Sequence, residues 1–401
     1  MNEFVKSIHP FPARMASSIV WERLPDRNPK LRILDPMSGS GTTLVVARMK
    51  GHSVYGVDRD PLARIISRAW CSDLDKELLE DKTQKILCRA QVTFKSLLSN
   101  NAYPRIADEK TKEFIRYWFD LKNRKQLTAL SKHISLVRDE GLKTLLWTAF
   151  SRTIITKKIG ASLAWDVSHS RPHKVYEKAP KTAFELFPKA VSYVAKNSPF
   201  NTLPSNSPKA RISDGDSRRL PFKKDYFDWV ITSPPYLNAI DYLRGHKLAL
   251  VWMGYTIGEI RKIRRDNIGA EVTHALLEKE HIKIALDLSC DVCNLGKRER
   301  GFLTRYIIDM DSVCSEVRRV LKPNGKVVFV IGNSTIKGVF IENSNAIRYL
   351  SEHHNLVVDS IEDRPLPENR RYLPPPSKRS SGKKLQARMR NEVILSMTKK
   401  S

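Results

Sequence analysis

Two prolines between a serine and a tyrosine follow a strand-like run at residues 228–232. The run reads Asp-Trp-Val-Ile-Thr, and Ser233, Pro234, Pro235 and Tyr236 come directly after it. Neither proline has an amide hydrogen, so the hydrogen-bond ladder of the strand must end there in a rigid turn. A serine oxygen and a backbone carbonyl fixed in such a turn can accept hydrogen bonds from an amine and localise its lone pair as a new bond forms. We therefore expect these four residues to form a catalytic loop that activates an amine.

A glycine-containing turn follows an earlier strand-like run at residues 31–34. It contains Asp35, Pro36, Ser38, Gly39, Gly41 and Thr42. Glycines at a strand-to-helix turn let the backbone approach a ligand closely, but this turn lacks both the third glycine of a dinucleotide site and the lysine of a P-loop. We expect a nucleoside cofactor without phosphates, namely S-adenosylmethionine, whose sulfonium charge an acid such as Asp35 would favour. Asp58 ends the next strand, where an acid commonly holds ribose hydroxyls. The alternative is an ordinary tight turn with two solvated acids.

Short β-branched runs alternate with helical stretches along much of the chain. These runs are residues 31–35, 53–58, 210–216, 228–232 and 326–333. The alternation predicts an α/β fold with a doubly wound, mostly parallel sheet, and ligands bind at the carboxyl ends of such strands. Residues 355–363 and 392–397 are two further expected strands, which could pair as a hairpin at the sheet edge. Before the run at 326–333, an amphipathic helix carries Ile307, Val313 and Val317 on one face, and Pro323-Asn324-Gly325 should end it.

Three stretches depart from the alternation. Residues 72–205 predict a large, mostly helical insertion, a candidate DNA-recognition region, so the catalytic core would comprise residues 1–71 and 206–401. Within the core we expect two inserted basic loops, an irregular one at 256–300 and a proline-rich one at 364–391.

The charge is strongly basic, with 70 Lys and Arg against 43 Asp and Glu and a formal net charge of +27. A polyanion, usually nucleic acid, is the expected partner, although a solvated basic surface or ribosome association would give the same balance. The five cysteines do not suggest a disulfide framework, and Cys290 and Cys293 lack a second pair, so we expect a reducing cytoplasm and no metal site. No apolar run is long and uncharged enough to predict a membrane span.

Residues 6–71 and 210–335 resemble the DNA amino-methyltransferases, which form N4-methylcytosine or N6-methyladenine. The segment 35–43 looks like the cofactor loop of that family, and Thr232–Tyr236 looks like its catalytic loop. The resemblance implies a class I methyltransferase-like, Rossmann-like fold, S-adenosylmethionine as cofactor, double-stranded DNA as substrate and a flipped base that stacks on Tyr236. It also implies that His9, Pro10 and Phe11 pack against the methionine part of the cofactor and that Asp216 lies by its adenine. A serine rather than an acid before the prolines favours cytosine N4.

Other residues are candidates for contacts with nucleic acid. They are Asn238, Tyr242, Arg171, His173, Arg264, Arg265, Arg370 and Arg371. Each has a plainer interpretation as a helix start, a polar loop or a solvated charged face. The resemblance implies a prokaryotic protein associated with the nucleoid, with a cognate restriction endonuclease as a possible partner. Methylation of adenine N6, methylation of RNA and a catalytically dead DNA-binding subunit remain alternatives, and the role of residues 151–175 is open.

Overall fold

A seven-stranded sheet forms the centre of the computed structural model, which describes residues 5–12, 14–26, 29–157, 159–167, 172–201, 208–237, 242–269, 279–366 and 391–401. The strands lie in the order β10-β11-β7-β6-β1-β2-β5. Their bounds are β1 Arg32–Asp35, β2 Ser53–Asp58, β5 Arg211–Asp214, β6 Phe227–Thr232, β7 Leu321–Gly332, β10 Leu356–Pro365 and β11 Asn391–Lys399. The pairs from β5 across to β7 are parallel, so the predicted doubly wound, mostly parallel sheet is confirmed.

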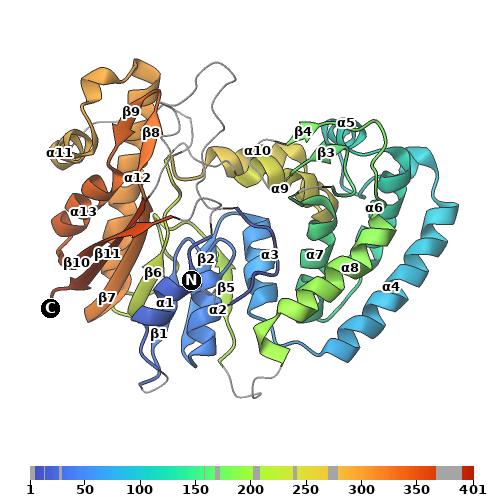
Figure 1. The fold of residues 1–401 in the computed structure, drawn as a ribbon, viewed down its shortest axis with the longest axis horizontal. Coiled ribbons are helices and arrows are strands. Elements are labelled where there is room, and N and C mark those ends of the chain that lie inside the picture. The colour runs from blue at the N-terminus through green and yellow to red at the C-terminus, as the bar shows by residue number, and fades with distance from the viewer. Residues whose placement is uncertain are drawn as a thin grey trace.

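Both faces of the sheet are buried under helices. Along β7, Val328 and Val330 join the core on one face, while Val327, Phe329 and Ile331 join the core on the other. The first core contains residues of α1 (Ser17–Arg23), α2 (Thr42–Met49) and α3 (Pro61–Trp70), and the second contains residues of α12 (Lys297–Val320) and α13 (Asn343–His353). A strand buried on both faces needs a continuous apolar run, which is why β7 reads Val-Val-Phe-Val-Ile. Figure 1 shows these helices flanking the strands.

The C-terminal strands form the predicted hairpin at the sheet edge. Strand β10 pairs antiparallel with β11, and β11 pairs antiparallel with β7. Strand β10 is therefore the edge strand, and β11 carries residues from the end of the chain into the sheet beside β7 (Figure 1).

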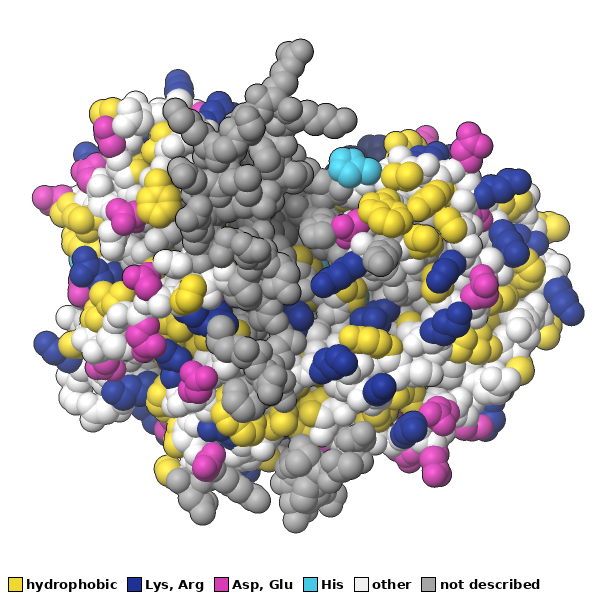
Figure 2. Space-filling view, viewed as in Figure 1, with side chains coloured by type: hydrophobic (Ala, Val, Ile, Leu, Met, Phe, Trp, Pro, Cys, Tyr) yellow, Lys and Arg dark blue, Asp and Glu magenta, His cyan; other side chains and the backbone are white. Residues whose placement is uncertain are grey.

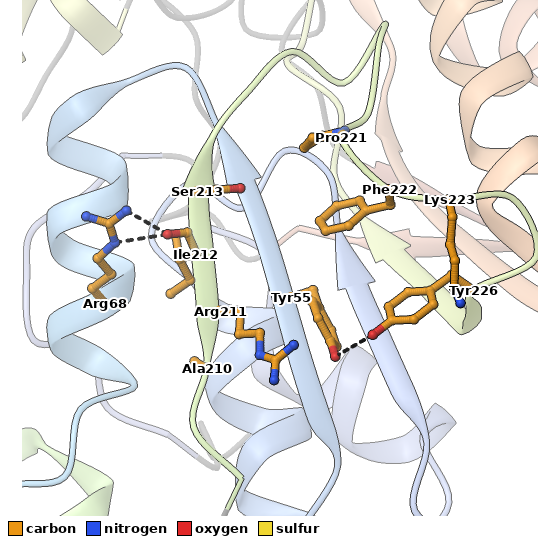
Figure 3. A pocket seen from close by; sticks show the side chains of 10 residues that line it. All are labelled: Tyr55, Arg68, Ala210, Arg211, Ile212, Ser213, Pro221, Phe222, Lys223 and Tyr226. Carbon is orange, nitrogen blue, oxygen red and sulfur yellow. Dashed lines mark hydrogen bonds between the residues drawn. The ribbon is translucent and has the colours of Figure 1, made fainter.

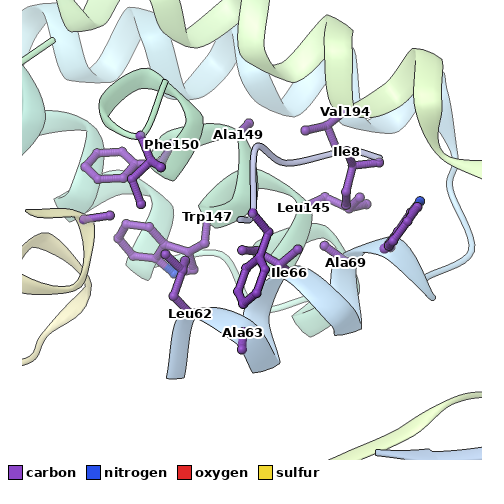
Figure 4. Packing of buried hydrophobic residues seen from close by; sticks show 14 of the residues in the cluster. Ile8, Leu62, Ala63, Ile66, Ala69, Leu145, Trp147, Ala149, Phe150 and Val194 are labelled. Atoms are coloured by element: carbon purple, nitrogen blue, oxygen red, sulfur yellow. The ribbon is translucent and has the colours of Figure 1, made fainter. Parts of the chain in front are cut away.

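Five helices and a short hairpin occupy most of residues 72–205. They are α4 Lys76–Ser96, α5 Glu109–Trp118, α6 Leu121–Ser135, α7 Glu140–Ile154, α8 Ala183–Asn197, β3 Ala164–Trp165 and β4 His173–Lys174. An aspartate begins each of the first four helices and accepts a backbone hydrogen bond, which satisfies an otherwise unpaired amide. These helices share one hydrophobic core with the sheet. Figure 4 shows Leu62 and Ile66 of α3 packed against Leu145 and Trp147 of α7, with Ile8 of the N-terminal segment in the same cluster.

The prediction of an irregular loop at 256–300 is wrong for the described part of that range. It contains α10 (Ile257–Arg265) and α11 (Glu280–Ser289), and α12 begins at Lys297. Thr256 and Glu259 form a reciprocal capping box that starts α10, a sequence signal that the high charge of the segment obscured. The expected proline-rich loop begins later than residue 364, because β10 continues through Pro365, and residues 367–390 lie outside the described range. Helix α12 ends at Val320, before Pro323.

The remaining described elements are α9 (Tyr242–Leu250), the small hairpin of β8 (Ser334–Ile336) and β9 (Val339–Ile341), and single 3₁₀ turns at 99–101, 199–201, 251–253 and 292–294. Helix α9 begins six residues after Tyr236 and so follows the predicted catalytic loop directly in the chain.

Candidate active site

A buried hydrogen bond joins the two predicted functional loops. Strands β1 and β6 are parallel neighbours, so their carboxyl ends, Asp35 and Thr232, lie at the same edge of the sheet. The Thr232 hydroxyl donates to Asp35 Oδ1 at 2.7 Å, and both side chains are buried. Burial raises the pKa of Asp35 to about 6, although the hydroxyls of Thr232 and Thr43 and the Met37 amide oppose the rise. The glycine loop and the catalytic loop therefore leave adjacent strands side by side.

The glycine loop makes a tight turn into α2. Gly39 and Gly41 both have positive φ angles, +47° and +89°. A Cβ atom on Gly41 would lie 2.7 Å from Ser67 Cβ, so only glycine fits against α3 at this position. The Ser38 hydroxyl is buried and has no hydrogen-bond partner within the described chain. Buried hydroxyls are normally paired, so this one is available to a ligand at the loop.

Asp58 closes the other side of the glycine loop. Its Oδ2 accepts from the Gly39 amide at 2.7 Å, and its Oδ1 accepts from the Asp60 amide at 2.8 Å. Burial raises the pKa of Asp58 to about 7, and the nearby Asp60 carboxylate adds to the rise. The predicted pair Asp35 and Asp58 thus sits on the loop, poised to ionise near neutral pH. These carboxyls and the unpaired Ser38 hydroxyl suit a cationic nucleoside better than a phosphate.

The N-terminal segment, which contains His9 and Pro10, brings Phe11 to the same loop. Phe11 lies against Gly39, where a Cβ atom would be 3.6 Å from its ring, and it stacks on Tyr242 of α9 with ring centroids 5.3 Å apart. His9 lies deeper, 1% exposed, and neither ring nitrogen has a partner among the described residues. Burial, followed by the charge of Arg152, holds the pKa of His9 well below its usual value. This histidine is neutral at neutral pH. Pro36 and Thr42 are buried within the glycine loop.

The catalytic loop is tied to the sheet by two side chains. The Ser233 hydroxyl donates to the Val330 carbonyl at 2.9 Å, and the Tyr236 hydroxyl donates to Glu392 Oε1 at 3.0 Å. The Ser233 hydroxyl also forms a hydrogen bond with the Tyr236 hydroxyl, which opposes the rise in the Tyr236 pKa, and a hydroxyl that donates to Val330 can still accept through its oxygen. Pro234 is buried, whereas Ser233, Pro235 and Tyr236 are half-buried. Burial, with the Glu392 carboxylate adding to it, raises the pKa of Tyr236 well above its usual value, so the phenol stays protonated.

Two residue groups at the site carry no sequence signal that we recognised. His246 of α9 bonds through Nδ1 to Asp60 Oδ2 at 2.5 Å, and both are buried, while His246 Nε2 has no described partner. Burial alone would raise the pKa of Asp60, but the neighbouring His246 and the amides at the start of α3 outweigh it and leave the pKa low. The His246 ring also lies 5.1 Å from that of Phe11. The second group is Glu392 with Arg364, at the far end of the chain.

Asp216, which is expected to lie by the cofactor adenine, has arginine partners in the structure. Its carboxylate accepts from Arg218 at 2.7 Å and from Arg59 at 3.1 Å, and Arg218 continues to Asp309 at 2.7 Å. Burial is outweighed by these arginine contacts, so the pKa of Asp216 lies below its ordinary value. The residue is one part of an ion-pair network beside β5, not an isolated acid.

Three of the residues proposed to contact nucleic acid can be placed on the surface. His173 lies on β4, and Arg264 and Arg265 lie in the last turn of α10; all three are exposed. Figure 1 shows β4 and α10 in the upper part of the view. Figure 2, drawn from the same side, shows Lys and Arg side chains spread over the region where the helices of residues 72–205 lie. Tyr242 instead packs on Phe11 beside the glycine loop. Asn238, Arg171, Arg370 and Arg371 lie outside the described residues.

A pocket of about 600 Å³ lies on the β2–β5 side of the sheet, away from both loops. Tyr55, Phe222 and Tyr226 form its aromatic wall (Figure 3). Tyr55 comes three residues before Asp58 on β2. The pocket therefore lies about 10 Å along the strand from its carboxyl end, where the glycine loop is. Within the described ranges, no three His, Cys, Asp or Glu side chains gather as metal ligands, and no helix is long and apolar enough to cross a membrane.

Comparison with known proteins supports the resemblance seen in the sequence. No family model matches the chain. The Type II methyltransferase M.MvaI of Kocuria varians is 25% identical, with 98% of this chain and 91% of that protein covered. The Type II methyltransferase M.BsoBI of Geobacillus stearothermophilus is 27% identical, with 77% and 70% covered, and M.AvaI of Anabaena variabilis is 24% identical, with 82% and 74% covered.

Solved structures align with the chain at low similarity. A TehB-like SAM-dependent methyltransferase from Corynebacterium glutamicum covers 96% of this chain and 86% of its own, at 9% identity and a TM-score of 0.31. A putative DNA modification methylase from Thermus thermophilus covers 47% and 51%, at 15% identity and a TM-score of 0.23. The family resemblance therefore rests on the sequence relatives and on the sheet itself. The resemblance to the DNA methyltransferases is confirmed by these Type II methyltransferases, which are 24–27% identical to this chain and cover 77–98% of it.

Proposed function

We propose that this protein is a site-specific DNA methyltransferase that methylates the exocyclic amine of a flipped base. The observation that carries the proposal is the Thr232–Asp35 hydrogen bond, because it sets an amine-activating loop directly beside a phosphate-free cofactor loop. Type II methyltransferases related over most of the chain support the same activity. The net charge of +27 suits a polyanionic substrate.

S-adenosylmethionine, the cofactor expected for such an enzyme, supplies an electrophilic methyl group when bound. Asp35, Ser38, Gly39, Gly41, Thr42 and Asp58 would hold it, with Phe11 against the loop. The raised pKa values of Asp35 and Asp58 leave two carboxyls that a cationic ligand would drive toward the ionised form. His9 and Pro10 would support Phe11 from behind, since His9 is buried.

In the proposed mechanism Ser233 orients the amine. Its hydroxyl hydrogen is donated to Val330, so a substrate N–H meets oxygen lone pairs. The carbonyl of Pro234 would accept the second N–H, and together the two acceptors would localise the nitrogen lone pair during a single direct displacement. The nitrogen would take the methyl group as the carbon–sulfur bond breaks with its electron pair left on sulfur, and the surplus N–H proton would pass to solvent. The ring of Tyr236, anchored through its hydroxyl, would offer a face to the flipped base. No covalent enzyme intermediate is required, because the amine itself attacks.

Cytosine N4 is the proposed target because a serine rather than an acid precedes the two prolines. Adenine N6 is the second candidate, since the same acceptors would serve its amine. An RNA substrate and an inactive DNA-binding subunit are weaker alternatives, and the intact loops argue against the second of these. His173, Arg264 and Arg265 would meet the DNA backbone, and a cognate restriction endonuclease in a prokaryotic cell would be the functional partner.

The test is to incubate the protein with isotopically labelled S-adenosylmethionine and unmodified genomic DNA, digest the DNA to nucleosides, and identify the labelled base by mass. Labelled N4-methylcytosine is the expected product. N6-methyladenine would overturn the choice of base, and label in RNA alone would overturn the choice of substrate. The Ser233→Ala variant serves as the control for the mechanism.

A further inference from the structure

A buried carboxylate from the end of the chain lies behind the catalytic loop. Glu392 is the second residue of β11 and is only 4% exposed. In the sheet it stands opposite Gly332 of β7 on one side and Arg364 of β10 on the other. Its Oε1 accepts from the Tyr236 hydroxyl at 3.0 Å, and its Oε2 accepts from Arg364 Nη1 at 2.9 Å. The hairpin therefore brings an ion pair to a loop 156 residues earlier in the chain.

Each oxygen of this carboxylate is satisfied by a different partner. A buried charge is tolerated only when it is paired and hydrogen-bonded, and removal of either partner leaves part of it unsatisfied. Arg364 supplies the compensating charge, and its side chain is 15% exposed. Tyr236 supplies the second hydrogen bond and is protonated at neutral pH, so it is a permanent donor. The direction of the Tyr236 ring is thereby fixed by an acceptor that cannot move without losing its own ion pair.

The catalytic loop needs a side-chain hydrogen bond of this kind, because its backbone can form few hydrogen bonds. Pro234 and Pro235 have no amide hydrogens to donate to the sheet. The Ser233 bond to Val330 fixes the first end of the loop on β7, and the Tyr236 bond to Glu392 fixes its other end on β11. The hairpin does not depend on this contact for its own position, because β11 pairs with β7 from Glu392 to Thr398.

We infer that Glu392 is a positioning residue that holds the Tyr236 ring for the flipped base, and that Arg364 anchors Glu392 in turn. This inference rests on the proposed function, since it assigns the ring a role toward the substrate. It gives the C-terminal hairpin a part in the reaction, although no residue of the hairpin would touch the methyl group or the amine.

A double-mutant cycle on the full-length protein tests the inference, with Tyr236→Phe, Glu392→Gln and the double variant. We expect each single change to lower kcat for DNA methylation by about tenfold, the effect of one hydrogen bond to a charged group, with an unchanged KM for S-adenosylmethionine. In Glu392→Gln the single amide oxygen must face the Arg364 donor, so the NH2 group faces Tyr236 and the acceptor of its hydroxyl is lost. The double variant should therefore be no slower than either single variant, because both changes remove the same hydrogen bond. Multiplied losses of about a hundredfold would overturn the inference, since Glu392 would then act independently of the tyrosine.

Glu362→Gln is the matched control. Glu362 lies on β10 of the same hairpin and pairs with Arg23 at 2.6 Å, away from the catalytic loop, and it is 52% exposed. This variant should keep wild-type kcat. A loss equal to that of Glu392→Gln would show that any damaged ion pair in the hairpin has this effect and would contradict a specific tie to Tyr236.

A second measurement separates this inference from the proposed function. In protein with ring-labelled tyrosine, the NMR signal missing from the Tyr236→Phe variant identifies Tyr236, and it should shift and broaden in Glu392→Gln without any DNA. If the wild-type protein methylated no nucleic acid but this change occurred, the proposed function would fail while the tie would stand. An unchanged Tyr236 signal would overturn the tie, whatever the activity.

Discussion

The Ser233 hydroxyl bonds the Val330 carbonyl at 2.9 Å and also acts on the Tyr236 hydroxyl, where it opposes the rise in pKa. With its hydrogen on Val330, its oxygen can still accept from an amine. We predict that Ser233→Ala lowers kcat by about 100-fold, the usual effect of losing one preorganised hydrogen bond in an active site, with little change in cofactor affinity. Single-turnover methyl transfer to DNA measures the step. Wild-type kcat in this variant would remove Ser233 from the mechanism.

We predict that Asp35 and Asp58 make cofactor affinity depend on pH. Burial raises their pKa values to about 6 and about 7, so both are largely protonated at pH 5. A bound cation or ribose hydroxyl favours the ionised form, so affinity must rise as pH rises through this window and level off above pH 7.

Calorimetric titration with S-adenosylmethionine from pH 5 to pH 8 would show this dependence, with a gain of up to about tenfold per pH unit for each carboxyl. In the Asp35→Asn variant, the increase in cofactor affinity near pH 6 should disappear, while the increase near pH 7 should remain. A flat profile in the wild-type protein would mean that neither carboxyl meets the cofactor.

At the scale of single elements, the glycine loop depends on close packing against α3. Gly41→Ala would place a Cβ atom 2.7 Å from Ser67 Cβ at a φ of +89°. We predict a loss of unfolding free energy of about 2–4 kcal/mol and weakened cofactor binding, because strain and overlap add. Gly338→Ala is the matched control, since its φ is +93° but no atom lies within 4 Å of its Cβ. It should lose only about 1–2 kcal/mol. Equal losses by chemical denaturation would contradict the packing argument.

The elements of the sheet could be predicted because their signals are local. Each expected strand is present, since β-branched runs with turn residues at their ends encode strands within a few residues. Helix α10 is an exception, because the charge of Arg261–Arg265 obscures the helix start that the Thr256–Glu259 capping box encodes. The meeting of the glycine loop and the catalytic loop could be predicted as well, because ligands of parallel sheets bind at the carboxyl ends of the strands.

The rest of the candidate site could not be predicted, because it depends on partners far apart in the sequence. Asp60 reads as an ordinary helix cap, yet it also bonds His246, 186 residues away. Glu392 reads as a polar residue at a strand start, yet it is buried against Tyr236. Asp216 resembles the family's cofactor acid, and its pairing with Arg59 and Arg218 could not be read from the sequence. No local pattern encodes such contacts.

For the whole molecule, the dominant feature is the excess of basic residues. With a net charge of +27, DNA binding should weaken steeply with salt, because each neutralised phosphate releases counterions. We predict that the double change Arg264→Gln and Arg265→Gln reduces the slope of log K against log salt by about 1–2, as two phosphate contacts would require. Fluorescence anisotropy with a DNA duplex between low and moderate salt measures this slope.

The control for the salt dependence is an equal loss of charge elsewhere. Lys30 and Lys224 are exposed just before β1 and β6, at the edge of the sheet opposite the two loops. Lys30→Gln with Lys224→Gln should leave the slope nearly unchanged, since those positions lie away from the proposed DNA contacts. Equal effects of the two double variants would show that net charge, and not the α10 surface, sets the affinity.

We propose that the two adjoining loops transfer methyl groups to DNA amines. The most direct test is mass identification of the labelled nucleoside after the protein, labelled S-adenosylmethionine and unmodified DNA have reacted. We expect label on the exocyclic amine, with N4-methylcytosine as the product and with at least a hundredfold slower formation by Ser233→Ala. Label on a ring carbon, or no label in DNA under conditions in which the protein binds both S-adenosylmethionine and DNA, would contradict the proposal.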